Sequence, residues 1–470
     1  MEYDITIGLE IHAEPNTQTK IFCGCKNQFS TVPNTNCCPV CLALPGALPM
    51  LSRAAVEKTI AAGLAMDCQI NELAIFERKH YFYPDLSKAY QISQLVRPIC
   101  TGGGITLKNG KHIRLNRIHL EEDAGKLLHN AVNQTSMVDC NRGGVPLNEL
   151  VTEPDISSAA EAVEFLEEIR SRLIFANVAE CRMEQGGMRC DVSISLKPAG
   201  SKTLGNRAEI KNLNSFKMVA RAIEFEIKRQ TEVLNSGGKV ALETRRFDEG
   251  SGKTISMRSK EQEVDYRYFP DPDIYAVKIT KSDIAKVRDN MPVLAYQLKE
   301  QFVTKFGLPE YDADVLTRSK NVAMFYLDCL NHLGEPKKVS NWIMVDLLKI
   351  MNDKSTETIP VSSAYLAEII KMVEDKKITK AVGLQLLDMV IEKPQPPSAL
   401  AQKMGLLVTI TDAQILDILN ALKKENPRVA EDFKSNKERV LRFIVGHVMK
   451  HTQGKAKSEN VERLIYKTFE

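Results

Sequence analysis

The sequence predicts an α+β fold in which strands dominate the first part of the chain and helices the rest. Up to about residue 270, apolar and polar residues alternate with period two in several segments, as in half-buried strands. Beyond Pro270–Asp273 the period becomes helical, and the proline-rich stretch Lys393–Pro397 precedes a last small helical region. We therefore predict three domains, at residues 1–291, 292–397 and 398–470.

Composition narrows the class of protein. The chain has 470 residues with 43% apolar content, enough for two or three domains with ordinary cores. Its net charge of +3 is too small to indicate, by itself, a protein that wraps nucleic acid. No apolar run reaches membrane-spanning length, and a strand pattern begins almost at the first residue, leaving no room for a signal or transit peptide. We expect a cytoplasmic protein.

Four segments with strand alternation carry acidic side chains opposite an apolar face: Ile5–His12, Arg117–Lys126, Met188–Leu196 and Arg207–Lys211. If these strands share a sheet, one face packs on helices and the other gathers the acids. The residues expected on that second face are Glu10, His12, Glu121 or Glu122, Asp191 and Glu209. Several carboxylates suit a hard cation such as Mg²⁺, which would also bring substrate phosphates to the site. Solvated strand ends are the simpler alternative.

The consecutive acids Glu121, Glu122 and Asp123 leave one choice open. Strict alternation places Glu121 on the polar face with His119, whereas a β-bulge at the strand end would place Glu122 there. Three adjacent carboxylates repel one another, so they need a cation or water nearby.

Five of the 11 cysteines lie close together in residues 23–41. Because the chain shows no secretion signal, these thiols indicate a reducing compartment and a metal site more than disulfides. Two close pairs, Cys23 with Cys25 and Cys38 with Cys41, have the spacing of a tetrahedral structural zinc site. Cys37 adjoins Cys38, so the choice between these two stays open, and free thiols are the alternative to zinc.

Further elements follow along the chain. Residues 52–66 predict a helix capped by Ser52. In Phe76–Gln94, aromatic and cationic residues interleave, which suits nucleotide or phosphate binding but also occurs in packed loops. Asp139–Asp155 resembles a second polar loop. Gly250–Thr254 resembles the end of a phosphate-binding loop but lacks its first glycine, so we predict a hairpin turn.

Helical patterns fill the remainder of the chain. Residues 292–392 predict a helical domain with Trp342, the only tryptophan, in its core. After the proline-rich linker, Ile415–Leu422 and Leu441–Val448 are each amphipathic. Residues 401–470 hold 13 Lys and Arg against 9 Asp and Glu, which suits phosphate contacts as well as a solvated helix face. The clustered basic residues are Arg439, Arg442, Lys450, Lys455 and Lys457.

At this point a family resemblance becomes specific. The chain resembles the B subunits of the glutamyl-tRNA(Gln)/aspartyl-tRNA(Asn) amidotransferases, and the resemblance covers essentially its whole length. The matching segments occur in order: Ile7–His12, Arg78–Asp85, His119–Lys126, Glu153–Ile156, Arg189–Asp191, Lys211–Ser215 and Asp265–Asp273.

The resemblance implies an ATP-dependent ligase whose catalytic domain is an antiparallel-sheet cradle similar to glutamine synthetase. Such subunits phosphorylate the side-chain carboxylate of Glu or Asp esterified to tRNA, and ammonia then displaces phosphate to give the amide. Because no Cys or Ser nucleophile here has a recognisable motif, ammonia must come from elsewhere. The family obtains it from an amidase-type A subunit, and a small C subunit joins the two. Its tail domain binds tRNA.

The resemblance also implies roles for individual residues. Glu10, His12, Glu122, Asp191 and Glu209 become the Mg²⁺ ligands, which favours Glu122 over Glu121. Lys79 is placed for phosphates or the substrate carboxylate, and Lys88 with Glu122 resembles the pair at the mouth of the ammonia channel. The residues expected to assist ATP binding and catalysis are Arg78, Lys79, Tyr81, Glu121 and Arg189.

Two other functional classes remain open on sequence alone. One is a zinc-containing tRNA-binding scaffold without chemistry, which ATP turnover dependent on charged tRNA would exclude. The other is a free-standing ligase acting on a small amino acid, against which the basic tail argues. Whether Glu-tRNA(Gln), Asp-tRNA(Asn) or both are substrates depends on the synthetases that accompany the protein.

Overall fold

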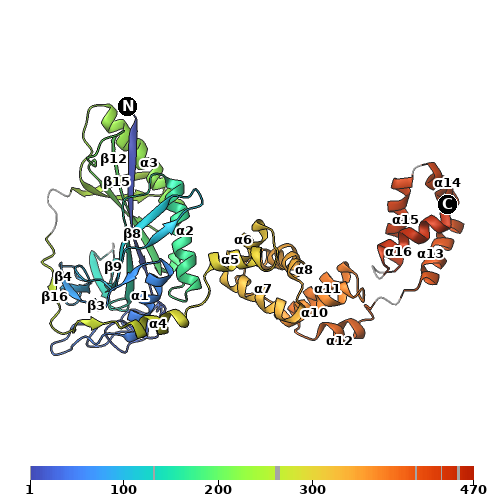
Figure 1. Ribbon diagram of the computed structural model, residues 1–470, viewed down its shortest axis with the longest axis horizontal. Helices are drawn as coiled ribbons and strands as arrows, with labels where there is room; N and C mark the ends of the chain where they lie inside the picture. Colours follow the sequence, from blue (N-terminus) through green and yellow to red (C-terminus); the bar gives the residue numbers. More distant parts are fainter. Residues whose placement is uncertain are drawn as a thin grey trace. The chain divides into compact units, whose positions relative to one another are not determined.

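The computed structural model describes residues 2–130, 133–259, 265–407, 410–435, 437–452 and 456–469. The chain divides into two compact units, Met1–Leu294 and Ala295–Glu470. The first unit is built on a large sheet with helices. In the second unit, all the secondary-structure elements of the described residues are helices (Figure 1). The predicted α+β class with all-α C-terminal regions is confirmed. The division of the second unit into two domains stays a prediction.

Ten strands of the described residues form the main sheet of the first unit, in the order β15-β14-β13-β12-β1-β11-β8-β6-β2, with β7 paired to β8. The strands are β1 (Tyr3–Ala13), β2 (Gln69–Ile70), β6 (Cys100–Thr101), β7 (Gly104–Thr106), β8 (His112–Glu122), β11 (Pro146–Thr152), β12 (Met188–Pro198), β13 (Ala208–Leu213), β14 (Glu243–Asp248) and β15 (Lys253–Ser259). The pairs are antiparallel except β13 with β14. Helix α3 (Phe216–Asn235) connects that parallel pair, which a short turn cannot join.

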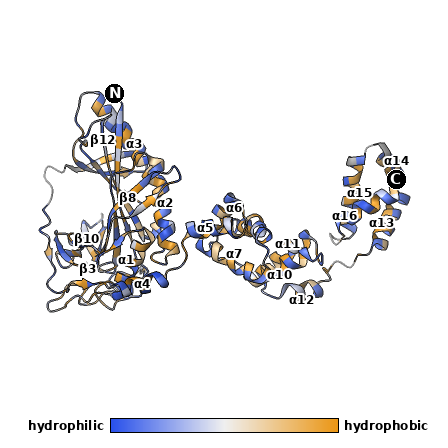
Figure 2. Cartoon of the chain, viewed as in Figure 1, coloured by the Kyte–Doolittle hydropathy of each residue, from blue (hydrophilic) through white to orange (hydrophobic). Residues whose placement is uncertain are grey.

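One face of this sheet is apolar and covered by helices. Alternation buries Ile7, Leu9 and Ile11 of β1. Against this face pack α1 (Arg53–Ala65), α2 (Ala159–Phe175) and α3, which show hydrophobic and hydrophilic sides in Figure 2. The hydroxyl of Ser52 accepts a hydrogen bond from the Ala55 N–H, so the predicted cap of α1 is confirmed. The four strands predicted to share a sheet do so.

Strand β11 corrects the sequence-based expectation of a loop at Asp139–Asp155. Pro146–Thr152 is a central strand between β1 and β8. Asn141–Val145 makes a turn, in which the Val145 N–H donates to the Arg142 carbonyl and Gly144 has a φ of +79°. Pro146 is tolerated because it is the first residue of the strand.

Smaller sheets flank the main one. Strand β4 (Glu77–His80) pairs with β5 (Tyr90–Ser93) and with β16 (Phe269–Pro270). A hairpin joins β9 (Lys126–Asn130) to β10 (Thr135–Asp139), and β17 (Val277–Lys278) pairs with β3 (Leu73–Ala74). Gly250–Thr254 lies at the β14–β15 hairpin, as predicted.

The second unit begins with antiparallel helices. The first group comprises α5 (Ala295–Thr304), α6 (Glu310–Thr317), α7 (Lys320–Leu333), α8 (Pro336–Asn341), α9 (Leu348–Asp353), α10 (Ser363–Glu374), α11 (Lys380–Glu392) and α12 (Pro397–Lys403). A π-helical segment, Trp342–Leu347, joins α8 to α9 and buries Trp342, as predicted. Helix α12 contacts α10 and α11.

The last helices have a core of their own. They are α13 (Asp412–Glu425), α14 (Arg428–Ser435), α15 (Lys437–His451) and α16 (Ser458–Phe469). Ile415, Leu419, Ile444 and Val448 lie in this core, so the two predicted amphipathic helices are confirmed. In the part of the chain that is described, every helix is too short or too polar to cross a membrane.

Candidate active site

Strand register brings acidic and imidazole side chains together on the face of the main sheet opposite the helices. Glu10 of β1 lies opposite Asp191 of β12, and His12 lies opposite Glu149 of β11. His119 of β8 lies on the other side of Glu149. Because these residues share the face opposite the helices, their side chains form two groups, which we call the histidine–glutamate group and the carboxylate group.

The histidine–glutamate group consists of His12, Glu121 and Glu149, with His119 beside it. The Nε2 atom of His12 is 3.3 Å from Glu149 Oε2 and 3.6 Å from Glu121 Oε1. Nε2 of His119 is 3.3 Å from Glu149 Oε2 and 3.5 Å from Glu121 Oε2. The Ser93 hydroxyl donates to Glu121 over 3.0 Å, which fixes that carboxylate from β5.

The two carboxylates dominate the electrostatics of this group. Burial by itself would lower the pKa of His119, but the charges of Glu149 and Glu121 raise it to about 9. Burial would raise the pKa of Glu149, yet His119 and His12 hold it well below its usual range. His12 Nδ1 is a buried polar atom without a partner among the described residues. Two ionised carboxylates with an imidazole fit a divalent cation by their donor chemistry.

The carboxylate group consists of Glu10, Asp191 and Glu209, each offering an oxygen within 4.8 Å of the others. Lys211 Nζ lies 2.7 Å from Asp191 Oδ2 and 2.9 Å from Glu209 Oε1. Burial and the charge of Glu149, followed by Glu209 and Asp191, raise the pKa of Glu10, and Lys211 offsets this only in part. Such a crowd of carboxylates fits a hard cation such as Mg²⁺.

Two cationic residues predicted for ATP or phosphate binding reach this face. Lys79 Nζ lies 5.1 Å from the centre of the Tyr266 ring and 5.9 Å from that of Tyr81. Burial lowers the pKa of Lys79, but the combined charges of Glu121, Tyr268, Glu149 and Tyr266 outweigh this effect and raise the pKa. Arg189 pairs with Asp123, with Nη2 3.0 Å from Oδ1.

Arg78 is placed differently from what we expected of an ATP ligand. Its Nε is 2.8 Å from Asp271 Oδ2 and its Nη2 is 2.7 Å from Asp273 Oδ2. The guanidinium also lies 4.2 Å from the centre of the Tyr90 ring. The guanidinium of Arg78 is therefore paired with two carboxylates of this chain. These ion pairs connect the segment after β16 to β4.

Glu122 joins neither group, and its role as an Mg²⁺ ligand stays a prediction. Its Oε2 lies 2.7 Å from Lys88 Nζ, and its Oε1 accepts the Ile92 N–H over 2.9 Å. Since β8 keeps a regular register through Glu121 and Glu122, alternation turns Glu122 away from the site face. Glu121 takes the place that the resemblance had given to Glu122.

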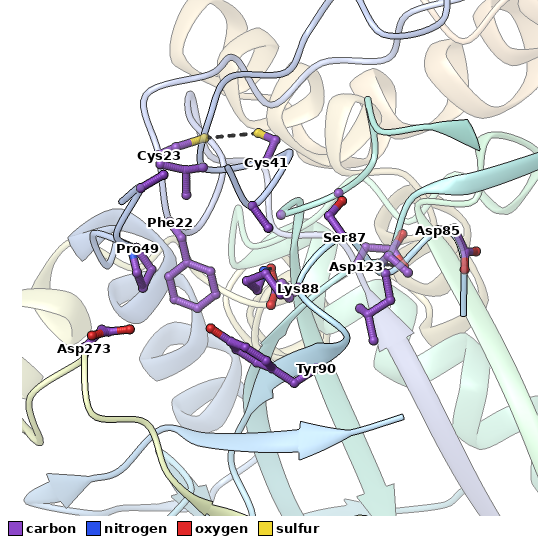
Figure 3. Close-up of a pocket in the computed structure, with 18 residues that line it drawn as sticks. Phe22, Cys23, Cys41, Pro49, Asp85, Ser87, Lys88, Tyr90, Asp123 and Asp273 are labelled. Carbon is purple, nitrogen blue, oxygen red and sulfur yellow. Dashed lines mark hydrogen bonds and ion pairs between the residues drawn. The ribbon is translucent and has the colours of Figure 1, made fainter. Parts of the chain in front are cut away.

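The Lys88–Glu122 pair lines a pocket of about 250 Å³ shown in Figure 3. In Figure 3, Phe22 and Pro49 lie on one side of Lys88 and Asp123 on the other, with the Tyr90 ring below. The predicted pair at an ammonia-channel mouth is therefore an ion pair at the wall of a cavity.

The four predicted cysteine ligands converge. Sγ of Cys41 lies 3.6 Å from that of Cys23, 3.8 Å from that of Cys38 and 3.9 Å from that of Cys25. Tetrahedral zinc with bonds of about 2.3 Å requires sulfur atoms about 3.8 Å apart, so the geometry fits a metal such as zinc. The thiol of Cys37 lies instead 3.4 Å from the Asn34 carbonyl, and the structure brings Cys38 into the group.

A buried lysine touches this cysteine group. Lys20 is fully buried, and its Nζ donates to the Gly143 carbonyl over 2.8 Å and lies 3.4 Å from Cys41 Sγ. A hydrogen bond from Cys23 and the charge of Lys20 lower the pKa of Cys41 to about 4, against the effect of burial. A charged lysine that is buried away from water needs a negatively charged partner. The position of Lys20 therefore indicates that cysteines of this group are deprotonated to thiolates.

Sequence reasoning missed Glu149 and Lys211. Glu149 was overlooked because its strand was taken for a loop, although Val145, Leu147 and Val151 alternate around it. The conformation of Lys211 between two acids depends on the pairing of β12 with β13, which has no local signal.

The predicted tRNA-binding residues lie mostly on α15. Arg439, Arg442 and Lys450 are exposed on that helix, and Lys457 is half-buried just before α16. Lys455 lies outside the described residues.

Comparison with known proteins gives matches along the chain. A family model described as the GatB/GatE catalytic domain matches residues 5–285, and a GatB domain model matches residues 325–469. Proteins from Caldicellulosiruptor bescii and Caldicellulosiruptor saccharolyticus are each 46% identical over 481 residues, covering 100% of both chains. One from Caldanaerobacter subterraneus subsp. tengcongensis is 43% identical over 470 residues, covering 99% of each. All three are named as the B subunit of an aspartyl/glutamyl-tRNA(Asn/Gln) amidotransferase.

Proposed function

Because the chain belongs to the GatB/GatE family of tRNA-dependent amidotransferase subunits, which are carbon–nitrogen ligases, we propose that it carries the kinase and transamidase site of such a complex. The substrate would be Glu-tRNA(Gln), Asp-tRNA(Asn) or both. In the first step, the γ-phosphoryl group of ATP passes to the side-chain carboxylate, and ADP leaves. In the second step, ammonia attacks the acyl carbon and phosphate leaves, which gives the amide.

One observation carries this proposal: the two acidic groups lie side by side on one sheet face, and the charges of Glu121 and Glu149 act on the buried Lys79. Phosphoryl transfer needs little covalent help from the protein and depends on positioning and charge stabilisation. A divalent cation held by His12, Glu121 and Glu149, or by Glu10, Asp191 and Glu209, would neutralise phosphate charge. The ammonium of Lys79 would orient the substrate carboxylate.

A pocket beside the carboxylate group offers room for ATP. It has a volume of about 390 Å³ and is lined by Thr6, Gly8, Glu10, Ser193 and Arg207, among others. We place the nucleoside there because Glu10 belongs both to this pocket and to the carboxylate group. The phosphates would then extend along the sheet face towards Lys79.

The Lys88–Glu122 pocket is our candidate for the arrival of ammonia. The carboxylate of Glu122 can accept hydrogen bonds from incoming ammonia and position it, while the cavity wall keeps the nucleophile away from bulk water. The ammonia would come from an amidase-type glutaminase A subunit, and a small C subunit would complete a heterotrimer.

Zinc on Cys23, Cys25, Cys38 and Cys41 would be structural, because four thiolates leave no open coordination position. The exposed cations of α15 would contact tRNA phosphates, so that the last helices hold the tRNA while the first unit performs the chemistry. We expect the assembled complex to act in the cytoplasm, where misacylated tRNA is found.

The test is to incubate the assembled complex with ATP, glutamine and each misacylated tRNA in turn. We expect amide formation on at least one of them, with ATP consumed only when charged tRNA is present. Tight tRNA binding without ATP turnover would instead support the non-catalytic scaffold, and amidation of free glutamate would support a ligase for small amino acids.

A further inference from the structure

A group of aromatic side chains lies next to the active site without belonging to either acidic group. They come from His80–Tyr83, at and after the end of β4, and from Asp265–Phe269, which leads into β16. The two segments together line an open pocket of about 650 Å³. We call it the aromatic pocket.

Several rings of the aromatic pocket face solvent. Phe82 is 79% exposed, Tyr83 54% and Phe269 44%. Single exposed apolar residues are normal on a protein surface, but a gathered set usually marks a binding site. The exposed rings of the aromatic pocket therefore suggest a binding surface.

Contacts between the two segments fix the shape of the aromatic pocket. The His80 N–H donates to the Tyr266 carbonyl over 2.9 Å, and His80 Nδ1 lies 3.2 Å from the Arg267 carbonyl. The His80 and Phe269 rings stack with their centres 5.1 Å apart. These contacts hold the two segments together, and an ordered binding surface lowers the entropic cost of binding a ligand.

Tyr81 connects the aromatic pocket to the active site. It lines the pocket, and its ring centre lies 6.2 Å from that of Tyr266. Lys79 Nζ lies 5.9 Å from the Tyr81 ring centre and 5.1 Å from that of Tyr266, so the pocket adjoins the Lys79 ammonium. Burial and then the charge of Glu121 raise the pKa of Tyr81. A ligand bound in the pocket would have its next chemical group beside Lys79.

We propose that the aromatic pocket binds the 3′-terminal base of the tRNA by stacking, an inference that rests on the proposed function. Aromatic rings with nearby cations are the surface on which unpaired bases stack. Lys79 and the exposed Arg267 supply the positive charge. Asp265 is the acid in the lining, and its Oδ1 already accepts the Arg267 N–H over 2.9 Å.

The chemistry of the substrate favours the terminal base over the adenine of ATP. In aminoacyl-tRNA the amino acid is esterified to the terminal ribose, so only this ribose and the amino acid itself separate the base from the reacting side-chain carboxylate. In ATP, the ribose and two phosphates separate the base from the γ-phosphate. The pocket beside Glu10 already provides space for that longer molecule.

The test is a binding cycle on the assembled complex, with uncharged tRNA that has or lacks its terminal adenosine. We expect removal of the adenosine to weaken binding to the wild type by about fivefold or more. The Phe82→Leu variant should bind intact tRNA more weakly and lose little more on truncation, and Phe82→Trp should restore the wild-type response. Tyr275→Leu is the matched control, because Tyr275 is 92% exposed in the same unit but lies outside the pocket.

Two results would overturn the inference while leaving the proposed function intact. The first is an equal cost of truncation in the wild type and in Phe82→Leu. The second is a raised KM for ATP in Phe82→Leu with unchanged tRNA affinity, which would assign the pocket to the adenine of ATP. A wild-type complex that binds no tRNA would overturn the proposed function itself, and this inference with it.

Discussion

Lys20 is the lysine that the described part of the chain buries completely, and it touches both Cys41 and the turn that precedes β11. We predict that Lys20→Met loosens the metal, since loss of a group that contacts a ligand commonly lowers metal affinity by about tenfold or more. The Lys20→Met variant should release zinc to a chromophoric chelator about tenfold faster than the wild type. Lys26→Met, which removes an exposed lysine of the same region, should release zinc at the wild-type rate. Equal rates for the two variants would contradict the role of Lys20.

Glu243 gives a residue-level prediction of pH dependence. Burial raises its pKa, but hydrogen bonds from Ser256 and Arg245 outweigh this and hold the pKa below its usual range. A carboxyl with a lowered folded-state pKa stabilises the fold above its unfolded-state pKa, and this stabilisation is lost as the pH falls through the folded-state pKa. Glu243→Gln should therefore cost roughly 1 to 3 kcal/mol at neutral pH and less in acid. The measurement is the free energy of unfolding in denaturant for the wild type and Glu243→Gln, from neutral to acidic pH. A difference between the two proteins that does not change with pH would refute the prediction.

Single residues were predicted from the sequence as far as local pattern allowed. Alternation along the first strand placed Glu10 and His12 on one face, because the period of a strand is a local property. The same rule placed Glu121 on the face of the site. The family resemblance favoured Glu122 instead, but Glu121 is the residue that lies close to His12 and Glu149. Which acids meet across strands depends on register between distant segments, and no single segment encodes that.

At the scale of elements, the missed strand β11 shows what hides a strand from sequence reasoning. Its neighbours bury Asn148 and Glu149 completely or nearly so, although both are polar. Asn148 Oδ1 accepts a hydrogen bond from Thr59 of α1, and Glu149 faces two histidines. Polar residues that are satisfied by distant partners break the apolar pattern on which the prediction depends.

The turn between β6 and β7 can be tested by substitution. Gly103 connects β6 to β7 with a φ of +82°, and a Cβ there would lie 2.5 Å from the Met66 carbonyl oxygen. Gly103→Ala should cost roughly 2 to 4 kcal/mol, from the left-handed conformation and the clash with backbone together. Gly110→Ala is the matched control, since Gly110 has a φ of +85° with open space around it. Equal losses of thermal stability in the two variants would show that the close approach is absent.

At the scale of the whole molecule, the change from period-two to helical patterns predicted the α+β class and the helical second part. The proline-rich stretch places the start of the tail at residue 398, but α12 contacts α10 and α11, so we place a truncation after it. Removing residues 410–470 should leave the remaining chain folded, because α13–α16 have a separate core. Binding of tRNA should weaken, and its dependence on salt should fall by about 0.9 in log–log slope for each phosphate that the tail no longer neutralises. Unchanged affinity and slope would mean that the cations of α15 are only solvated.

The central claim is that the histidine–glutamate group, and not Glu122, supports phosphorylation of the substrate carboxylate. The most direct measurement is single-turnover formation of the phosphorylated aminoacyl-tRNA from ATP by the assembled complex, without an ammonia source. Glu149→Gln should lower this rate by about 100-fold or more, since it removes a charge-stabilising group from the site. Glu122→Gln, its control on the neighbouring strand, should phosphorylate at nearly the wild-type rate and fail later, in glutamine-dependent amide formation. Wild-type phosphorylation by Glu149→Gln, or its loss in Glu122→Gln alone, would contradict this account.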